Sequence, residues 1–139
     1  MSGDRLAFGG ASVVQVRVAR PTRQLEKVVA FYRDGLGLRE IDRFQGHNGY
    51  DGVMLGLPGR TYHLEFTQHA EDGPCPAPSD DNLLVLYIPD AAEYRRLCAR
   101  LERLGYPPVE PANPYWRGKS KTFEDPDGWR VVLCHGSGI

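Results

Sequence analysis

The chain has 139 residues, of which 41% are hydrophobic and 25% charged, and its formal net charge is −1. This length suits one domain with its own core, and the balanced charge argues against a nucleic-acid-binding protein, which would need a basic surface. No apolar run reaches the ~20 residues of a membrane span and no signal-peptide pattern opens the chain, so we expect a cytoplasmic protein without membrane contact.

The first ten residues hold three glycines and predict a loose leader. Residues 13–19 then alternate apolar and polar side chains, which predicts a half-buried strand with its valines on one face. After Pro21, apolar residues recur at intervals of three and four over residues 23–38, the spacing of an amphipathic helix. We expect Thr22 to cap this helix and Gly35 or Gly37 to end it.

Two further strands are expected at residues 39–44 and 52–57, on either side of a loop that contains Gly and Asn. A Pro-Gly turn at 58–59 leads to a strand over residues 62–69. There Leu64 and Phe66 point to one face of the sheet, where a helix can cover them. His63, Glu65 and Thr67 point to the other face, which makes the first two candidate catalytic or metal-binding residues.

After a Pro-rich connector at about 71–81, the order of elements starts again. Strands are expected at 83–88, near 109, at 120–123 and at 129–134, with a helix at 92–104 and a strong turn signal at 125–128. The chain therefore predicts an α+β fold of two βαβββ modules, at about 12–70 and 82–136, in a single domain of residues 1–139. The modules would form one cupped mixed sheet with the helices on its outer faces.

Two motifs resemble the vicinal oxygen chelate superfamily, which includes glyoxalase I, bleomycin-resistance proteins and extradiol dioxygenases. Residues 31–38, FYRDGLGL, resemble the FYxxxLG helix end of that family. Residues 123–129, FEDPDGW, resemble its F-x-DPDG turn before the last strand. The resemblance covers about residues 13–135 and implies the same cupped fold, commonly as a homodimer.

In metal-dependent members, four strands each supply one ligand to the cup, and the resemblance maps these positions onto this chain. Glu65 is the only match, because the other positions fall on Gln15 (or Arg17), Leu83 and Val132. Leucine and valine offer no donor to a hard divalent ion, so no metal cofactor is expected. A divalent metal held by His63, Glu65 and His69 remains an alternative.

Strand alternation predicts which side chains would line the cup: Gln15, Arg17, His63, Glu65, Thr67, Leu83, Val85, Tyr87, Arg130, Val132 and Cys134. A carboxylate in a partly buried cup needs compensation. We therefore expect Arg17 to bind Glu65 bidentately in place of the metal, which requires the two groups to lie within hydrogen-bonding distance. The alternative is an ordinary ion pair. His63 is either a general base or a hydrogen-bonded wall residue.

The loop at 113–119 places two adjacent aromatic residues, Tyr115 and Trp116, between cations, which suits either an aromatic or anionic ligand or simple packing. We predict a protein that binds a small organic molecule without the family's metal, through Gln15, Arg17, Tyr87, Tyr115, Trp116 and Arg130. The alternative is a lyase, isomerase or dioxygenase that uses Glu65 as base or ligand. A third possibility is an interaction module whose cup is vestigial.

Overall fold

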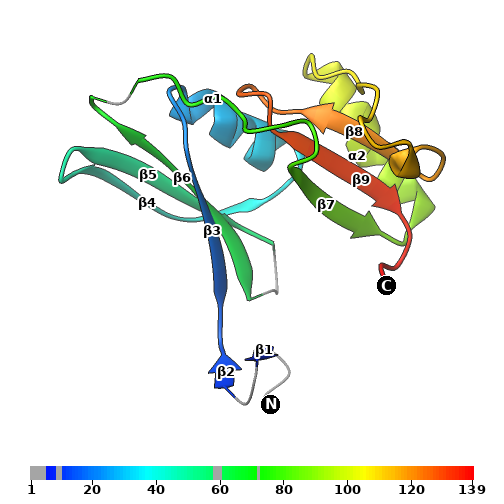
Figure 1. The fold of residues 1–139 in the computed structure, drawn as a ribbon, viewed down its shortest axis with the longest axis horizontal. Helices are drawn as coiled ribbons and strands as arrows, with labels where there is room; N and C mark the ends of the chain where they lie inside the picture. Colours follow the sequence, from blue (N-terminus) through cyan, green and yellow to red (C-terminus); the bar gives the residue numbers. More distant parts are fainter. Residues whose placement is uncertain (1–5, 9–10, 58–60, 72) are drawn as a thin grey trace. The chain divides into compact units, whose positions relative to one another are not determined.

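The computed structural model describes residues 6–8, 11–57, 61–71 and 73–139. They form two compact units, Met1–Pro74 and Cys75–Ile139, which are described separately (Figure 1). The expected Pro-Gly turn at 58–59 lies outside the described residues. None of the helices in the described part of the chain is long and apolar enough to cross a membrane.

The first unit contains a four-stranded sheet in the order β3-β6-β5-β4. Its strands are β3 (Val16–Pro21), β4 (Arg39–His47), β5 (Tyr50–Gly56) and β6 (Tyr62–His69). β3 runs parallel to β6, and the other neighbours are antiparallel. Two short strands, β1 (Leu6–Phe8) and β2 (Ala11–Val13), pair with each other ahead of this sheet, so residues 6–8 of the expected loose leader form a strand.

The helix between β3 and β4 covers one face of this sheet by packing on β5 and β6. It begins as α1 (Leu25–Ala30) and continues as a π-helical turn, η1 (Phe31–Gly35). As predicted, Leu64 and Phe66 are buried on the helix side, and the Tyr32 ring stacks on Phe66 with centroids 4.8 Å apart. Burial of these large apolar side chains is the main favourable contribution to this unit's stability.

Several local predictions for this unit need correction. The helix is capped at Gln24, and the Thr22 hydroxyl instead accepts a hydrogen bond from the Gln24 N–H. The valines of the first strand do not form a buried face, because Val14 is 60% exposed and Val18 is 40% exposed. β4 and β5 are longer than expected and meet in a two-residue turn at Asn48 and Gly49, both with positive φ, as tight hairpins require.

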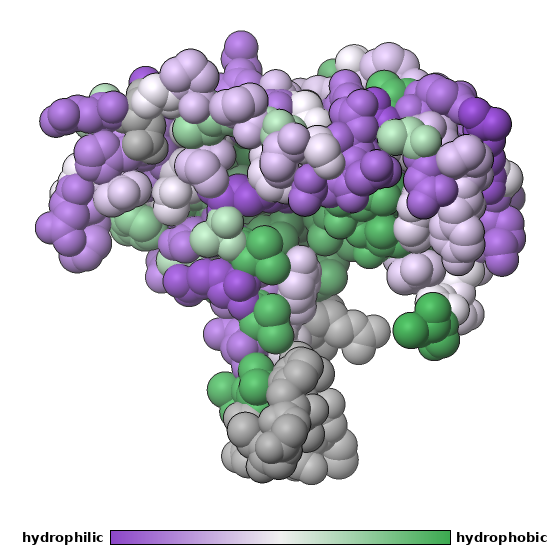
Figure 2. Space-filling model, viewed as in Figure 1, coloured by the Kyte–Doolittle hydropathy of each residue, from purple (hydrophilic) through white to green (hydrophobic). Residues whose placement is uncertain are grey.

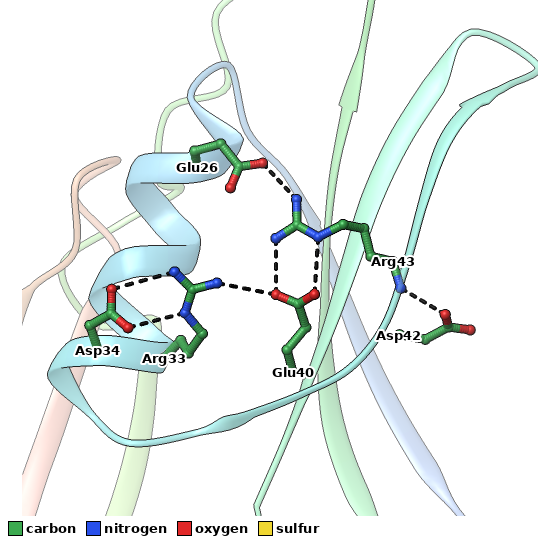
Figure 3. Close-up of polar contacts among 6 residues, drawn as sticks. All are labelled: Glu26, Arg33, Asp34, Glu40, Asp42 and Arg43. Carbon is green, nitrogen blue, oxygen red and sulfur yellow. Dashed lines mark hydrogen bonds and ion pairs between the residues drawn. The ribbon is translucent and has the colours of Figure 1, made fainter.

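A chain of ion pairs joins the helix to the edge strand β4 (Figure 3). Arg43 donates two hydrogen bonds to the Glu40 carboxylate, at 3.0 and 2.9 Å, and a third to Glu26 on α1, at 2.8 Å. Glu40 also accepts from Arg33, which binds Asp34 in turn. The two carboxylates beside Arg43 raise its pKa, and Arg43 lowers the pKa of Glu40. Hydrophilic residues, with some hydrophobic ones between them, make up the left side of Figure 2, where the β4–β5 hairpin lies.

The second unit repeats this arrangement with a three-stranded sheet in the order β7-β9-β8. Its elements are β7 (Leu83–Ile88), α2 (Ala91–Arg103), the 3-10 turn η2 (Pro114–Trp116), β8 (Ser120–Glu124) and β9 (Arg130–His135). β7 runs parallel to β9, and Val109 forms a single bridge with Thr122 where a short strand was expected.

Helix α2 packs on β7 and β9. The Asp90 side chain caps it by accepting from the Glu93 N–H at 2.9 Å, and Gly105, with φ of +96°, follows its end. Cys98 and Leu101 form its buried side, whereas Leu104 at its end is 50% exposed. In both units the strand before the helix, β3 or β7, lies parallel beside the last strand, β6 or β9. The predicted α+β fold of two βαβββ-like modules is therefore confirmed.

The turn before β9 depends on one buried carboxylate. Asp125 accepts hydrogen bonds from the Asp127 and Trp129 N–H groups at 2.8 and 3.0 Å. We predict that Asp125→Ala lowers the free energy of unfolding by about 2 kcal/mol or more, because two N–H groups lose their acceptor. Urea unfolding measures this. Asp81→Ala, which removes an exposed carboxylate, should change stability by less than about 0.5 kcal/mol; equal losses would contradict the assignment.

Candidate functional site

The parallel register of β3 and β6 decides which polar side chains meet in the first unit. Arg17 lies opposite His63 and Ala19 lies opposite Glu65. Paired residues of a parallel ladder point to the same face, so the side chains of Arg17, His63 and Glu65 share the sheet face that α1 does not cover. The structure therefore brings together three of the predicted site residues.

Arg17 binds His63 rather than gripping Glu65. Its Nε donates a hydrogen bond of 2.9 Å to His63 Nε2, whereas its nearest terminal nitrogen lies 3.7 Å from Glu65 Oε1. That separation allows an ion pair but exceeds a hydrogen bond. The expected bidentate pair of Arg17 and Glu65 was therefore wrong, because the guanidinium is oriented by the imidazole instead. The Arg17 side chain is 48% exposed and that of Glu65 only 14%.

The hydrogen bond from Arg17 also determines the tautomer of His63. Since Nε2 accepts, the ring proton of the neutral imidazole sits on Nδ1. His63 is only 5% exposed, and its Nδ1 has no hydrogen-bond partner among the described residues. Burial lowers the pKa of His63, and the positive charge of Arg17 lowers it further, against a smaller opposing effect of Glu65. The imidazole is therefore held neutral, as a hydrogen-bonded wall residue would be.

This donor set does not fit the metal that the superfamily resemblance implies. The Nε2 lone pair of His63 is already taken by Arg17, and the guanidinium faces Glu65. A divalent cation there would meet a fixed positive charge and only one carboxylate, which Arg17 already pairs with. The alternative site is not formed either, because no three His, Cys, Asp or Glu side chains of the described residues gather in a metal-binding group. His69 Nδ1 instead accepts from the Glu71 N–H.

The remaining first-strand candidate, Gln15, is exposed and lies just before β3, outside the sheet. In the second unit Arg130 is held by the protein's own carboxylates. Its Nε lies 3.1 Å from Glu124 and 3.5 Å from Asp80, and its NH1 donates to the Glu110 carbonyl. Sequence reasoning missed both acidic partners, Glu124, which the register of β8 and β9 puts opposite Arg130, and Asp80.

A pocket of about 250 Å³ lies at the end of the second sheet where β7 and β9 finish. Its floor is one row of the sheet, in which Tyr87 lies opposite Cys134 and Cys134 opposite Ser120. Tyr115 and Trp116 form a wall, and their rings pack edge to face with centroids 4.9 Å apart. Three of the predicted ligand-binding residues, Tyr87, Tyr115 and Trp116, therefore line one pocket.

Local hydrogen bonds hold the aromatic wall in place. The Asn113 side chain accepts from the Tyr115 N–H at 3.0 Å, which starts the 3-10 turn, and Pro114 suits its first position. The Ser120 hydroxyl then donates to the Trp116 carbonyl and ties the turn to β8. The far side of the pocket is the tail, residues 136–139, which sequence reasoning missed because it carries no motif.

Family models match both units of the chain. Residues 16–67 match the YycE-like N-terminal domain, and residues 81–135 match the YycE-like C-terminal domain. A protein from Bacillus subtilis (strain 168), YycE, is 48% identical over 132 residues, which is 95% of each chain.

Solved structures agree with this assignment. The crystal structure of YycE from Bacillus subtilis has a TM-score of 0.91 at 48% identity and covers 96% of this chain and 98% of that one. TnmS3, an antibiotic-binding protein from Streptomyces sp. CB03234, has a TM-score of 0.66 at 25% identity, covering 94% and 100%. The fosfomycin-resistance protein FosX from Mesorhizobium loti, at 19% identity and a TM-score of 0.65, covers 94% of each chain and shows the same fold. The predicted vicinal oxygen chelate fold is confirmed.

The lowered pKa of His63 predicts how stability changes with pH. Below its ordinary pKa of about 6.5, the unfolded chain binds a proton at this residue that the folded chain resists. The free energy of unfolding should therefore not depend on His63 protonation above about pH 6.5. It should fall as the pH drops from there towards the pKa of His63 in the folded chain. Urea unfolding between pH 5 and 8 measures this slope. His63→Gln should reduce it and the exposed control His47→Gln should not; an unchanged slope in His63→Gln would contradict the assignment.

Proposed function

The chain belongs to the YycE-like family, and we propose that it binds a small organic molecule of aromatic character in the pocket of the second unit. The observation that carries this proposal is the pocket itself, where Tyr87, Tyr115 and Trp116 line a volume of about 250 Å³. Aromatic walls with a few polar groups are the usual chemistry of small-molecule sites.

The size and walls of the pocket limit the ligand. Small-molecule sites commonly span about 300–1,000 Å³, so this one suits a compound of one or two rings. Flat rings can stack on Tyr and Trp faces, while the Cys134 thiol and Ser120 offer only weak or already engaged polar contacts. Such a pocket holds its ligand mainly by burial of apolar surface, and binding needs no chemical step.

We also propose that binding requires no metal. Glu65 is the only superfamily ligand position at which this chain matches the family's residue, and the guanidinium of Arg17 faces it at 3.7 Å. The neighbouring His63 already accepts a hydrogen bond from Arg17 at its Nε2, so this nitrogen is not available to a metal ion. A fixed cation next to both donors opposes a second, divalent one.

The similarity to TnmS3 supports a binding role. That protein is described as antibiotic-binding, and this chain shares 25% of its sequence over its full length. Holding an organic molecule is therefore a function that this fold supports in a relative. The aromatic pocket supports such a role here, but it points to no particular drug.

The test is a titration of the nitrogen-15-labelled protein with 2-naphthamide, a neutral two-ring probe. The indole N–H signal of Trp116 should shift on binding, and that of Trp129, which does not line the pocket, should stay. For a ligand of this size we expect a Kd of about 1 mM. Trp116→Ala should weaken binding at least about tenfold, because a stacking wall is lost.

The exposed aromatic Tyr50 provides the matched control, since it lies in the first unit and lines no part of the pocket. Tyr50→Ala should bind the probe as the parent protein does. If the probe shifted neither indole signal, or if Trp116→Ala bound it with unchanged affinity, the proposed function would be wrong.

A further inference from the structure

The cluster of Arg17, His63 and Glu65 on the first sheet contains a carboxylate whose hydrogen-bonding capacity is unused. The Glu65 side chain is only 14% exposed, yet it forms no hydrogen bond with any described residue and has Arg17 at 3.7 Å. A carboxylate withdrawn from water normally accepts several hydrogen bonds, because burial without them is costly. Glu65 is therefore an open acceptor, and its small exposed part is accessible from solvent.

Arg17 has the complementary open donors. Its Nε donates to His63 Nε2 at 2.9 Å, and this hydrogen bond holds the guanidinium in one orientation. Its two terminal nitrogens form no hydrogen bond with a described residue, and the side chain is 48% exposed. Because arginine carries N–H donors on all three nitrogens, those on both terminal nitrogens stay open. The cluster thus places open donors beside an open acceptor on one face of the sheet.

The opposite charges of Arg17 and Glu65 limit the ligands that this cluster can recognise. An anion drawn to the guanidinium would also approach the carboxylate, and a cation drawn to the carboxylate would also approach the guanidinium. On the same face the edge strand β4 adds Arg39 and Asp42, one charge of each sign, both exposed and two strands from β6. The cluster therefore favours neither sign of charge, and it suits a neutral group that carries an acceptor and a donor side by side.

Apolar side chains lie beside the cluster on the same face. In the ladder of β5 and β6, Met54 is opposite Glu65 and Gly56 is opposite His63. Gly56 leaves the space above it to Ile41 of β4, because a Cβ at Gly56 would collide with Ile41 Cδ1. Ile41 is 55% exposed, so part of its surface is open to contact. A ligand held by the cluster can therefore rest an apolar body on Met54 and Ile41.

From these observations we propose that the first unit holds a second binding site, which recognises a neutral amide group attached to an apolar body. The amide carbonyl accepts from the terminal nitrogens of Arg17, and the amide N–H donates to Glu65. The site is preorganised, because His63 already holds the guanidinium in place. None of these residues lines the aromatic pocket, so this inference does not rest on the proposed function. Binding involves no chemical step.

The test compares four probes that share a cyclohexane ring: cyclohexanecarboxamide, methyl cyclohexanecarboxylate, the cyclohexanecarboxylate anion and the cyclohexylmethylammonium cation. Each is titrated into nitrogen-15-labelled protein, and the side-chain Nε–H signal of Arg17 reports binding. The amide should bind with a Kd of about 5 mM. The other probes should bind at least about threefold more weakly, because the ester lacks the N–H donor and each ion meets a like charge.

Two variants change the charge of the cluster. Glu65→Gln leaves Arg17 unopposed, so the carboxylate probe should become the tightest ligand. Arg17→Gln leaves Glu65 unopposed, so the ammonium probe should become the tightest, as read from the Glu65 backbone N–H signal. A merely structural role of these residues would weaken all probes alike. Arg39→Gln is the matched control, because it removes an exposed cation from the same face and should keep the preference for the amide.

The outcomes separate this site from the aromatic pocket. Tightest binding of the amide by the parent protein, with the expected switch in each variant, would support the inference. It would be overturned by equal binding of amide and ester, by tighter binding of either ion to the parent, or by an amide preference that survives in Arg17→Gln. An Arg17 signal that no probe shifts would overturn it too. The proposed function is read from the Trp116 indole signal, so each proposal can fail without the other.

Discussion

The parallel pairing of the strand before the helix with the last strand, β3 with β6 and β7 with β9, is the constraint on which each unit depends. It brings residues that are 46 positions apart, Arg17 and His63, into a hydrogen bond, and it places Tyr87 beside Cys134 in the other unit. Because paired residues of such a ladder share a face, a shift of one residue would turn every one of these side chains to the opposite side. Burial of Leu64 and Phe66 under the helix prevents that shift in the first unit.

Much of this could be predicted from the sequence because strand alternation is local. The faces of β6 and β9 followed from alternation alone, and the turn signal at 125–128 marked the start of β9. Alternation does not predict which of two nearby polar groups an arginine side chain will bind. Arg17 could reach either Glu65 or His63, and the register places it directly opposite the histidine. The expected pair was therefore wrong in its partner although correct in its location.

The pocket was predictable in part for the same reason. Tyr115 and Trp116 could be predicted as ligand-binding residues because they are adjacent aromatic residues between cations. Tyr87 could be predicted from the sheet face on which strand alternation places it. The small residues that tie them together gave no signal. Ser120 donates one hydrogen bond from its hydroxyl to the Trp116 carbonyl, and residues 136–139 line the pocket without forming a recognisable motif.

The expected homodimer stays a prediction.

The first unit has the vicinal oxygen chelate fold and places a cation, Arg17, beside Glu65 and His63, and the second unit holds the aromatic pocket. Arg17 is oriented by the imidazole of His63, and its positive charge adds to the effect of burial in lowering the pKa of that imidazole. Our proposal is that the same charge opposes a metal ion. Ligand binding would then depend on aromatic walls and not on coordination.

The most direct measurement is the metal content of the purified protein by mass spectrometry, followed by thermal-shift titrations with nickel, zinc, manganese and iron(II). The account predicts substoichiometric metal and no increase in melting temperature, because Arg17 faces both Glu65 and His63. One metal ion per chain that is lost in Glu65→Ala would contradict it and favour the metal-dependent alternative.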